Sequence, residues 1–240
     1  MSNGSRPDIV ADFRAAFETL KRYPVIAAPP LIAMAVGFVL KLVFLGAGAG
    51  MFVVGGAVGG SAGMAGALAS GLFLFLIFIV LVMLLNLVAH AAVVVMARDA
   101  TASREPSIGT AVDAVMSRLG SVAIAALIFS VIVGIASLFF VIPGLIAALF
   151  LMFTMPAVIL DGLAPMDAVS RSFRLVKDNF GTVIGLVIGA IVAMVVLWVA
   201  LLILGMVPVV GPLATMLLAG AFFAYLTAVG VRVYLALPRG

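Results

Sequence analysis

Two polar residues inside an apolar stretch are the first candidates for chemistry in this sequence. Asn86 and His90 lie four residues apart, so a helix would place both side chains on one face. As a functional pair they could bind a polar solute or relay a proton, because imidazole titrates near neutral pH. As a structural pair they would hydrogen-bond neighbouring helices or backbone carbonyls, and we favour this interpretation.

A third polar residue, Lys41, lies alone in the same apolar stretch, well before Asn86. Its long stem can carry the ammonium group to the lipid headgroups. We favour this interpretation over a role in a polar path or in headgroup binding.

The sequence shows no pattern of residues for catalysis or metal binding. It has one His and no Cys, and every Asp and Glu lies outside the apolar stretches. A general acid–base pair needs two titratable groups within reach of a substrate. No base accompanies Ser130, Ser137 or Thr154 in the sequence. We therefore predict that the chain is not an enzyme, with no catalytic residue, no metal and no cofactor.

The composition predicts a membrane protein. Hydrophobic residues make up 66% of the chain and charged residues 9%, whereas soluble proteins carry about 25% charged residues. The net charge of +4 is small and the bases lie beside acids, so we expect no nucleic-acid partner. Membrane lipids are the expected partners, because bases near the bilayer attract anionic headgroups.

The charged residues fall into four short segments, at residues 6–22, 98–118, 161–178 and 232–239. The stretches between them contain only one charge, Lys41. Each stretch is long enough for two helices of about 20 apolar residues, the length that crosses a bilayer. Two crossings return the chain to its starting side, and the bases predict that this side is cytoplasmic, with both termini inside. We expect the cytoplasmic (inner) membrane of a bacterium or archaeon.

The predicted fold is an all-α membrane bundle of six spans in three hairpins. The spans are predicted at residues 25–45, 72–96, 120–141, 145–160, 181–204 and 213–236. Pro143-Gly144 and residues 208–212 are predicted to be turns. The glycine-rich residues 46–71 could be a loop or closely packed helical extensions, and we favour a loop with some helix.

An amphipathic helix in the headgroup plane is predicted before each hairpin. In the clearest one, residues 166–180, apolar residues recur at helical spacing opposite charged ones. The apolar positions are Met166, Val169, Phe173, Val176 and Phe180. The basic candidates for headgroup contact are Lys21, Arg22, Arg171, Arg174 and Lys177. The order of interfacial helix, span, turn and span thus occurs three times, in units 6–97, 98–160 and 161–237 of a single domain 1–240.

Small residues recur at every fourth position in the last two predicted spans. They are Gly181, Gly185, Gly189 and Ala193, and then Gly220, Ala224 and Ala228. Such stripes let helix backbones approach closely. We favour packing within the third hairpin. The alternative is a homo-oligomer or a larger membrane complex that docks there.

The strongest resemblance to a known family lies in residues 143–190. The run from Pro143 to Gly162, followed by the run from Pro165 to Phe180, resembles the six-span membrane domain attached to some bacterial glycerophosphodiester phosphodiesterases. The resemblance implies a six-span membrane fold. The phosphodiesterase activity of that family belongs to a soluble catalytic barrel, so the resemblance does not imply this activity here.

Three functions remain open from the sequence. The first, which we favour, is a non-enzymatic membrane scaffold or accessory subunit that acts through helix packing and basic interfacial helices. The second is a small permease or lipid transporter with a path near Asn86 and His90. The third is an interfacial lipid-modifying enzyme.

Overall fold

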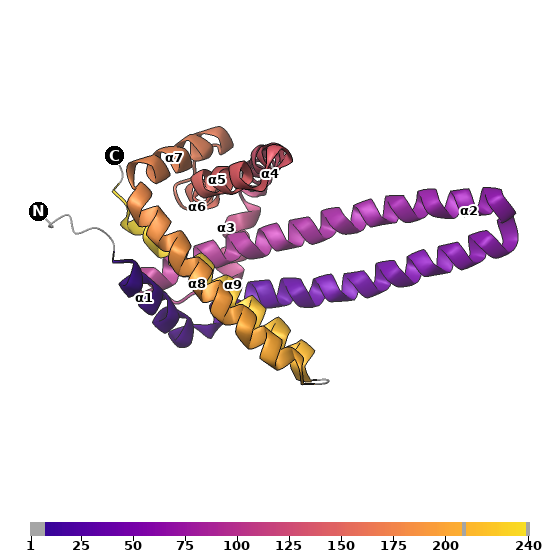
Figure 1. Ribbon diagram of the computed structural model, residues 1–240, viewed down its shortest axis with the longest axis horizontal. Helices are drawn as coiled ribbons and strands as arrows, with labels where there is room; N and C mark the ends of the chain where they lie inside the picture. Colours follow the sequence, from indigo (N-terminus) through magenta and orange to yellow (C-terminus); the bar gives the residue numbers. More distant parts are fainter. Residues whose placement is uncertain (1–7, 208–209, 239–240) are drawn as a thin grey trace, which may run out of the picture. The chain divides into compact units, whose positions relative to one another are not determined.

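The computed structural model describes residues 8–207 and 210–238, and these residues form helices and no strand. The predicted charged segments at residues 6–22 and 232–239 and the predicted turn at residues 208–212 therefore lie partly outside the described residues. The elements are α1 (Ile9–Arg22), the 3₁₀ turn η1 (Pro24–Ala27), α2 (Ala28–Thr101), α3 (Ile108–Met116), α4 (Leu119–Phe139), α5 (Val141–Leu151), α6 (Thr154–Leu160), α7 (Pro165–Asp178), α8 (Phe180–Gly205) and α9 (Val210–Ala236) (Figure 1).

Six helical stretches among the described residues are long and apolar enough to cross a membrane. They are Pro24–Ala57, Gly59–Thr101, Leu119–Leu138, Val141–Leu160, Phe180–Gly205 and Leu213–Ala236. The expectation of an all-α membrane protein with six apolar helices is confirmed at this level.

Residues 32–86 form a compact unit made of two arms of α2 (Figure 1). The arms meet at Gly60, whose φ of 54° and ψ of −139° are open to glycine and strained for other residues. Gly55 and Gly63 face each other so closely that a Cβ on either would meet the backbone of the other. The prediction of a loop over residues 46–71 is wrong, because glycine here serves close helix contact, which outweighs its poor helix propensity.

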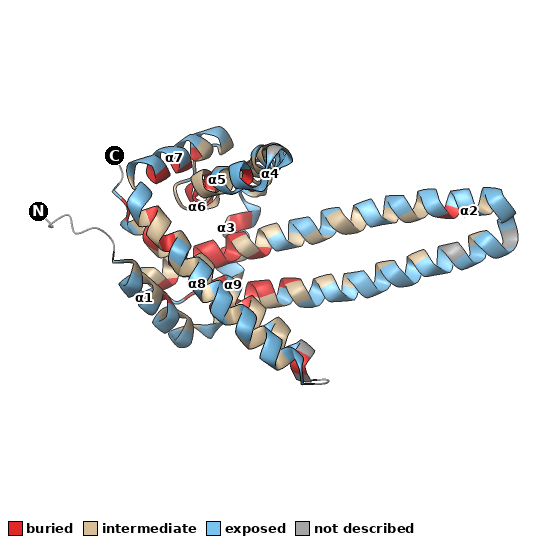
Figure 2. Ribbon diagram, viewed as in Figure 1, coloured by how far each residue is buried: buried red, intermediate tan, exposed pale blue. Residues whose placement is uncertain are grey.

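The other unit contains residues 1–31 and 87–240 and holds the main apolar core. Residues 91–97 of α2 are all buried, so this part of the helix is covered on every side (Figure 2). The largest fully buried side chains include Met96, Phe153, Val158 and Tyr234, which come from α2, the α5–α6 region and α9. Within this unit α4 packs on α5, α6 on α7, and α1 on both α8 and α9.

The connection between α4 and α5 is shifted from its predicted place. Phe140 is the extended residue between the two helices, whereas Pro143 and Gly144 lie in the first turn of α5. Proline is tolerated there because the first turn needs no backbone donor from it. Gly144 is buried against α4, where a Cβ would meet the side chain of Ser137. The Pro-Gly pair therefore begins a helix and allows close packing, and the predicted turn at these residues is wrong.

Candidate functional site

The fourth apolar stretch is broken between α5 and α6. α5 ends at Leu151 and α6 begins at Thr154. Pro156 explains the break, because it has no N–H for the Met152 carbonyl and its ring would clash with that carbonyl in a continuous helix. Backbone groups freed inside an apolar environment need new partners.

A serine from α7 supplies these partners. The Ser172 hydroxyl donates to the Phe150 carbonyl oxygen at 2.8 Å. The Ser172 hydroxyl oxygen also accepts a hydrogen bond from the Phe153 N–H at 3.1 Å. Ser172 is 0% exposed and lies between Ala168 and Leu175 on the buried face of α7. The prediction of an interfacial helix considered the apolar stripe and the charges and did not identify Ser172. The spacing of Ser172 from Ala168 and Leu175 places all three on one helix face and could have indicated a buried position.

A cavity of about 270 Å³ lies beside this break. Its polar lining side chains are His90 from α2, Ser130 from α4 and Thr154 from α6. Thr154 is 2% exposed, and its hydroxyl has no hydrogen-bond partner among the described residues. A buried hydroxyl without a partner costs about 1–3 kcal/mol, so this position favours a bound polar molecule. The fold thus brings His90 to two hydroxyl groups that no sequence spacing connects to it.

Asn86 has a different environment from His90. It is exposed, and its side-chain amide donates to the Val82 carbonyl oxygen of its own helix at 2.8 Å. His90 contacts the Phe223 ring edge-on, with ring centroids 5.3 Å apart. The lining of the His90 cavity does not include Asn86. The polar residues that line this cavity together with His90 are Ser130 and Thr154, which come from other helices.

Lys41 lies in the unit formed by residues 32–86. It is exposed and lines a groove of about 630 Å³ between the two arms of α2. The other lining residues are apolar or glycine, including Phe44 and Phe78, whose ring centroids are 5.4 Å apart. Lys41 is therefore the charged residue of an otherwise apolar groove.

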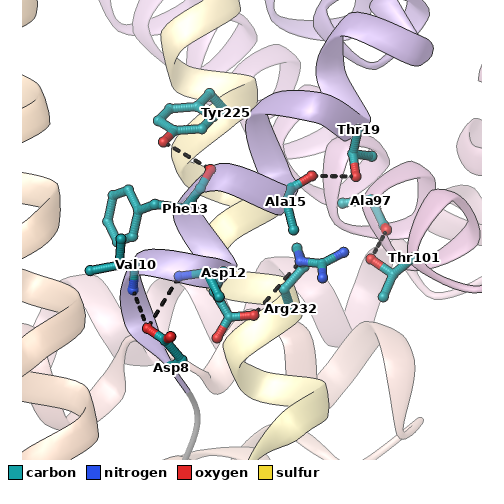
Figure 3. A network of polar contacts seen from close by, with 11 residues as sticks. Asp8, Val10, Asp12, Phe13, Ala15, Thr19, Ala97, Thr101, Tyr225 and Arg232 are labelled. Carbon is teal, nitrogen blue, oxygen red and sulfur yellow. Dashed lines mark hydrogen bonds and ion pairs between the residues drawn. The ribbon is translucent and has the colours of Figure 1, made fainter.

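α1 docks on the last two helices through polar and aromatic contacts (Figure 3). The Tyr225 hydroxyl donates to the Phe13 carbonyl oxygen at 3.2 Å, and the Tyr225 ring meets the edge of Phe13 at 6.1 Å. Arg232 Nε lies 3.8 Å from Asp12 Oδ1. The Asp12 side chain is 16% exposed and faces Arg232 of α9.

Burial and charge oppose each other at Asp12. Burial raises the pKa of the Asp12 carboxyl above its ordinary value of 3.8, the Arg232 guanidinium lowers it, and the Asp8 carboxylate raises it further. The net pKa is raised, so the docked position favours the protonated acid.

The small-residue stripe of α8 receives α1. A Cβ on Gly189 would lie 2.8 Å from the Phe13 ring, and one on Gly185 would lie 3.4 Å from the Ile9 side chain. Gly181 has no atom within 4 Å of the same position. The remaining stripe residues are placed as follows: Ala193 lines a groove with Phe17 and Tyr225, and Gly220, Ala224 and Ala228 are buried in α9. Two of the stripe glycines thus face the N-terminal helix.

The segment between α6 and α7 is fixed by two contacts. The Tyr234 hydroxyl donates to Asp161 Oδ2 at 2.5 Å, which ties this segment to α9. Gly162 has a φ of 70°, and a Cβ there would meet the Arg118 guanidinium. A side-chain hydrogen bond and close packing therefore position the segment between α6 and α7.

The exposed side of α7 carries both apolar and basic groups. Met166 and Phe173 are exposed, and so are Arg174 and Lys177. Phe180, which was predicted in the same amphipathic helix, is the exposed first residue of α8. Arg171 is half-buried. On α1, Lys21 and Arg22 are exposed, and the Lys21 ammonium lies 4.8 Å from the centre of the Phe17 ring.

No group of three metal-ligating residues occurs in the part of the chain that the structure describes.

Six apolar helices of spanning length define an integral membrane protein. Residues 107–236 match the model of a family described as a domain of unknown function (DUF7847), and this match covers more than half of the chain. The chain therefore belongs to the DUF7847 family. No curated protein and no solved structure matches it. The resemblance to the membrane domain of glycerophosphodiester phosphodiesterases stays a prediction.

Proposed function

We propose that this protein is a non-enzymatic membrane scaffold or accessory subunit. Its six spans form three hairpins, preceded by the interfacial helices α1, α3 and α7. The protein lies in the cytoplasmic membrane of a bacterium or archaeon, with both termini inside. The basic faces of α1 and α7 contact the lipid headgroups and hold the bundle at a fixed depth for a partner.

The construction of α7 carries this proposal. One face is attached to the bundle through Ser172 and the buried Leu175 and Val176. The other side presents Phe173 beside the exposed bases Arg174 and Lys177. Exposed aromatic groups next to bases are typical of a helix at the membrane surface. Because these buried contacts hold α7 against the bundle, its exposed side can act as a docking surface.

Site-specific photo-crosslinking tests the scaffold proposal. A photoreactive residue replaces Lys177 on the exposed side of α7, and the matched control replaces Val196, which is exposed on the apolar helix α8. We expect a defined protein adduct from position 177 in native membranes and lipid adducts alone from position 196. Lipid adducts alone from both positions would contradict a scaffold that docks a partner on α7.

A second function, a small permease, is favoured by the cavity at the broken helix. His90, Ser130 and Thr154 line about 270 Å³ beside the break, and interrupted helices line substrate sites in many transporters. The test is stopped-flow light scattering of proteoliposomes exposed to glycerol or urea. A permease would raise the permeability above that of protein-free liposomes, and Thr154→Val would reduce it. Permeability equal to that of protein-free liposomes would exclude both solutes as substrates.

A further inference from the structure

A groove of about 970 Å³ lies between α4, α5 and α7. Its walls are apolar and include Ile132 of α4 and Pro143, Ile146 and Leu151 of α5. Phe150 of α5 stacks on Phe173 of α7, with ring centroids 4.7 Å apart. The volume lies within the range of about 300–1,000 Å³ that is usual for small-molecule sites.

One edge of this groove is polar and carries two opposite charges. Asp167, Ser170 and Arg174 of α7 line it at spacings of three and four residues, so they lie on one side of the helix. All three are exposed, and neither Asp167 nor Arg174 has an ion-pair partner among the described residues. The two charged residues are seven positions apart, which is about 10 Å along the helix axis. A ligand that carries both charges can therefore lie between them.

We propose that this groove binds one phospholipid with a primary-amine headgroup, of the phosphatidylethanolamine type. The Arg174 guanidinium and the Ser170 hydroxyl donate hydrogen bonds to the phosphate. The ammonium group, two carbons away from the phosphate oxygen, donates to the Asp167 carboxylate. This inference rests on the placement of α7 in the headgroup layer under the proposed function.

The apolar walls of the groove suit the acyl chains of the same phospholipid. From Leu151 to Pro143, α5 extends for about 12 Å along the groove wall, enough for the first part of an acyl chain. α5 belongs to the spanning stretch Val141–Leu160, so an acyl chain in the groove stays in the hydrocarbon layer. One lipid thus satisfies the charges on α7 and the exposed apolar wall of α5 together.

The headgroup chemistry predicts which lipids bind. A choline headgroup has no N–H to donate to Asp167, and a glycerol headgroup brings no positive charge to it. A charge-assisted hydrogen bond is strong enough for about a tenfold preference. A protein surface that bound lipids only through the attraction between its bases and negative headgroups would instead prefer the anionic glycerol headgroup.

Native mass spectrometry of the full chain in detergent tests the proposal. The protein is titrated with phosphatidylethanolamine, phosphatidylcholine and phosphatidylglycerol that carry identical acyl chains. We expect one bound phosphatidylethanolamine, with affinity about tenfold above that for the other two lipids. Equal binding of all three lipids, or a preference for phosphatidylglycerol, would overturn the proposal.

Variants separate the two ends of the headgroup. Asp167→Asn is expected to abolish the preference over phosphatidylcholine while leaving phosphatidylcholine binding unchanged. Arg174→Ala is expected to weaken the binding of all three lipids about tenfold. The matched controls are Asp178→Asn and Arg14→Ala, which are exposed charges outside the groove lining. A wild-type headgroup preference in Asp167→Asn would overturn the role of Asp167 whatever the stability of the variant.

A crosslinker distinguishes a lipid from a protein occupant. A photoreactive residue in place of Ala147, which lines the groove on α5, should form lipid adducts in native membranes. A peptide adduct from this position would overturn the proposal in favour of a partner helix. The scaffold proposal is tested separately from position 177, so either proposal can fail while the other holds.

Discussion

The two units of this chain are held together by different means. In residues 32–86, the two arms of α2 meet through the backbones of Gly55 and Gly63 and through Phe44 and Phe78. The side-chain hydrogen bond described in this unit, from Asn86, stays within its own helix. In the other unit, side-chain hydrogen bonds join separate helices, as Ser172 joins α7 to the break between α5 and α6.

The difference follows from where the backbone is interrupted. An unbroken helix satisfies its own backbone groups, so the arms of α2 need only close contact. The break at α5 and α6 frees a carbonyl and an N–H in apolar surroundings, and a polar side chain must approach from another helix. The break between α5 and α6 therefore explains the position of Ser172, and Thr154, the other buried polar residue in the described part of the chain, lies at the same break.

Removing the hydroxyl at the break should have the largest effect on stability. Ser172→Ala leaves the Phe150 carbonyl and the Phe153 N–H without their partner, at a cost of about 2–4 kcal/mol for the two groups. Unfolding in mixed micelles, followed by circular dichroism, measures this loss. The control Ser170→Ala, exposed on the same helix, should change stability by less than about 0.5 kcal/mol. Equal stability of the two variants would show that the break does not depend on Ser172.

Adding a side chain between the arms of α2 should have the next largest effect. Gly63→Val forces atoms into the Gly55 backbone and is expected to cost about 1–3 kcal/mol and to separate the arms. The chain has no Cys, so spin labels on Val53→Cys and Leu68→Cys report this separation specifically. Gly66→Ala meets no atom within 4 Å and should instead stabilise by about 0.5–1 kcal/mol. An unchanged label distance in Gly63→Val would contradict backbone contact as the basis of this unit.

Loss of one hydrogen bond between α1 and α9 should have a smaller effect. Tyr225→Phe removes the donor to the Phe13 carbonyl and is expected to cost about 0.5–1.5 kcal/mol. Ala16 lies on the buried face of α1 and is 0% exposed. The thiol of Ala16→Cys should therefore react faster with a maleimide when Tyr225→Phe loosens α1. Thr227→Ala is the control, because the Thr227 hydroxyl donates only within α9. The same labelling rate in Tyr225→Phe and Thr227→Ala would argue against this contact as a tie for α1.

The smallest expected effect is the pH dependence of α1 docking. Burial raises the pKa of Asp12 in the docked state above its ordinary value of 3.8, so the docked state holds its proton more tightly than the released state. Docking should be strongest below 3.8 and weaken as pH rises through the raised pKa. The mobility of a spin label on Ala16→Cys should therefore increase with pH, and Asp12→Asn should remove this change. A mobility that falls as pH rises would mean that the ion pair with Arg232 outweighs burial.

The sequence predicted the six apolar helices and their order, because each depends on local composition. It did not predict the helical form of residues 46–71, where glycine propensity favoured a loop and contact between the arms prevailed. It placed Pro143 in a turn, since proline begins helices as readily as it ends them. Among the candidate residues, it placed His90 beside Asn86, whereas the fold places it beside Ser130 and Thr154.

The sequence by itself therefore determined the apolar stretches and the charged segments between them. These are properties of neighbouring residues and of the length that a helix needs to cross a bilayer. Only the tertiary structure decided that Ser172 binds the break 22 residues earlier and that Tyr225 holds Phe13 from 212 residues away. A freed backbone group needs a partner, and only the folded arrangement of the helices decides which side chain reaches it.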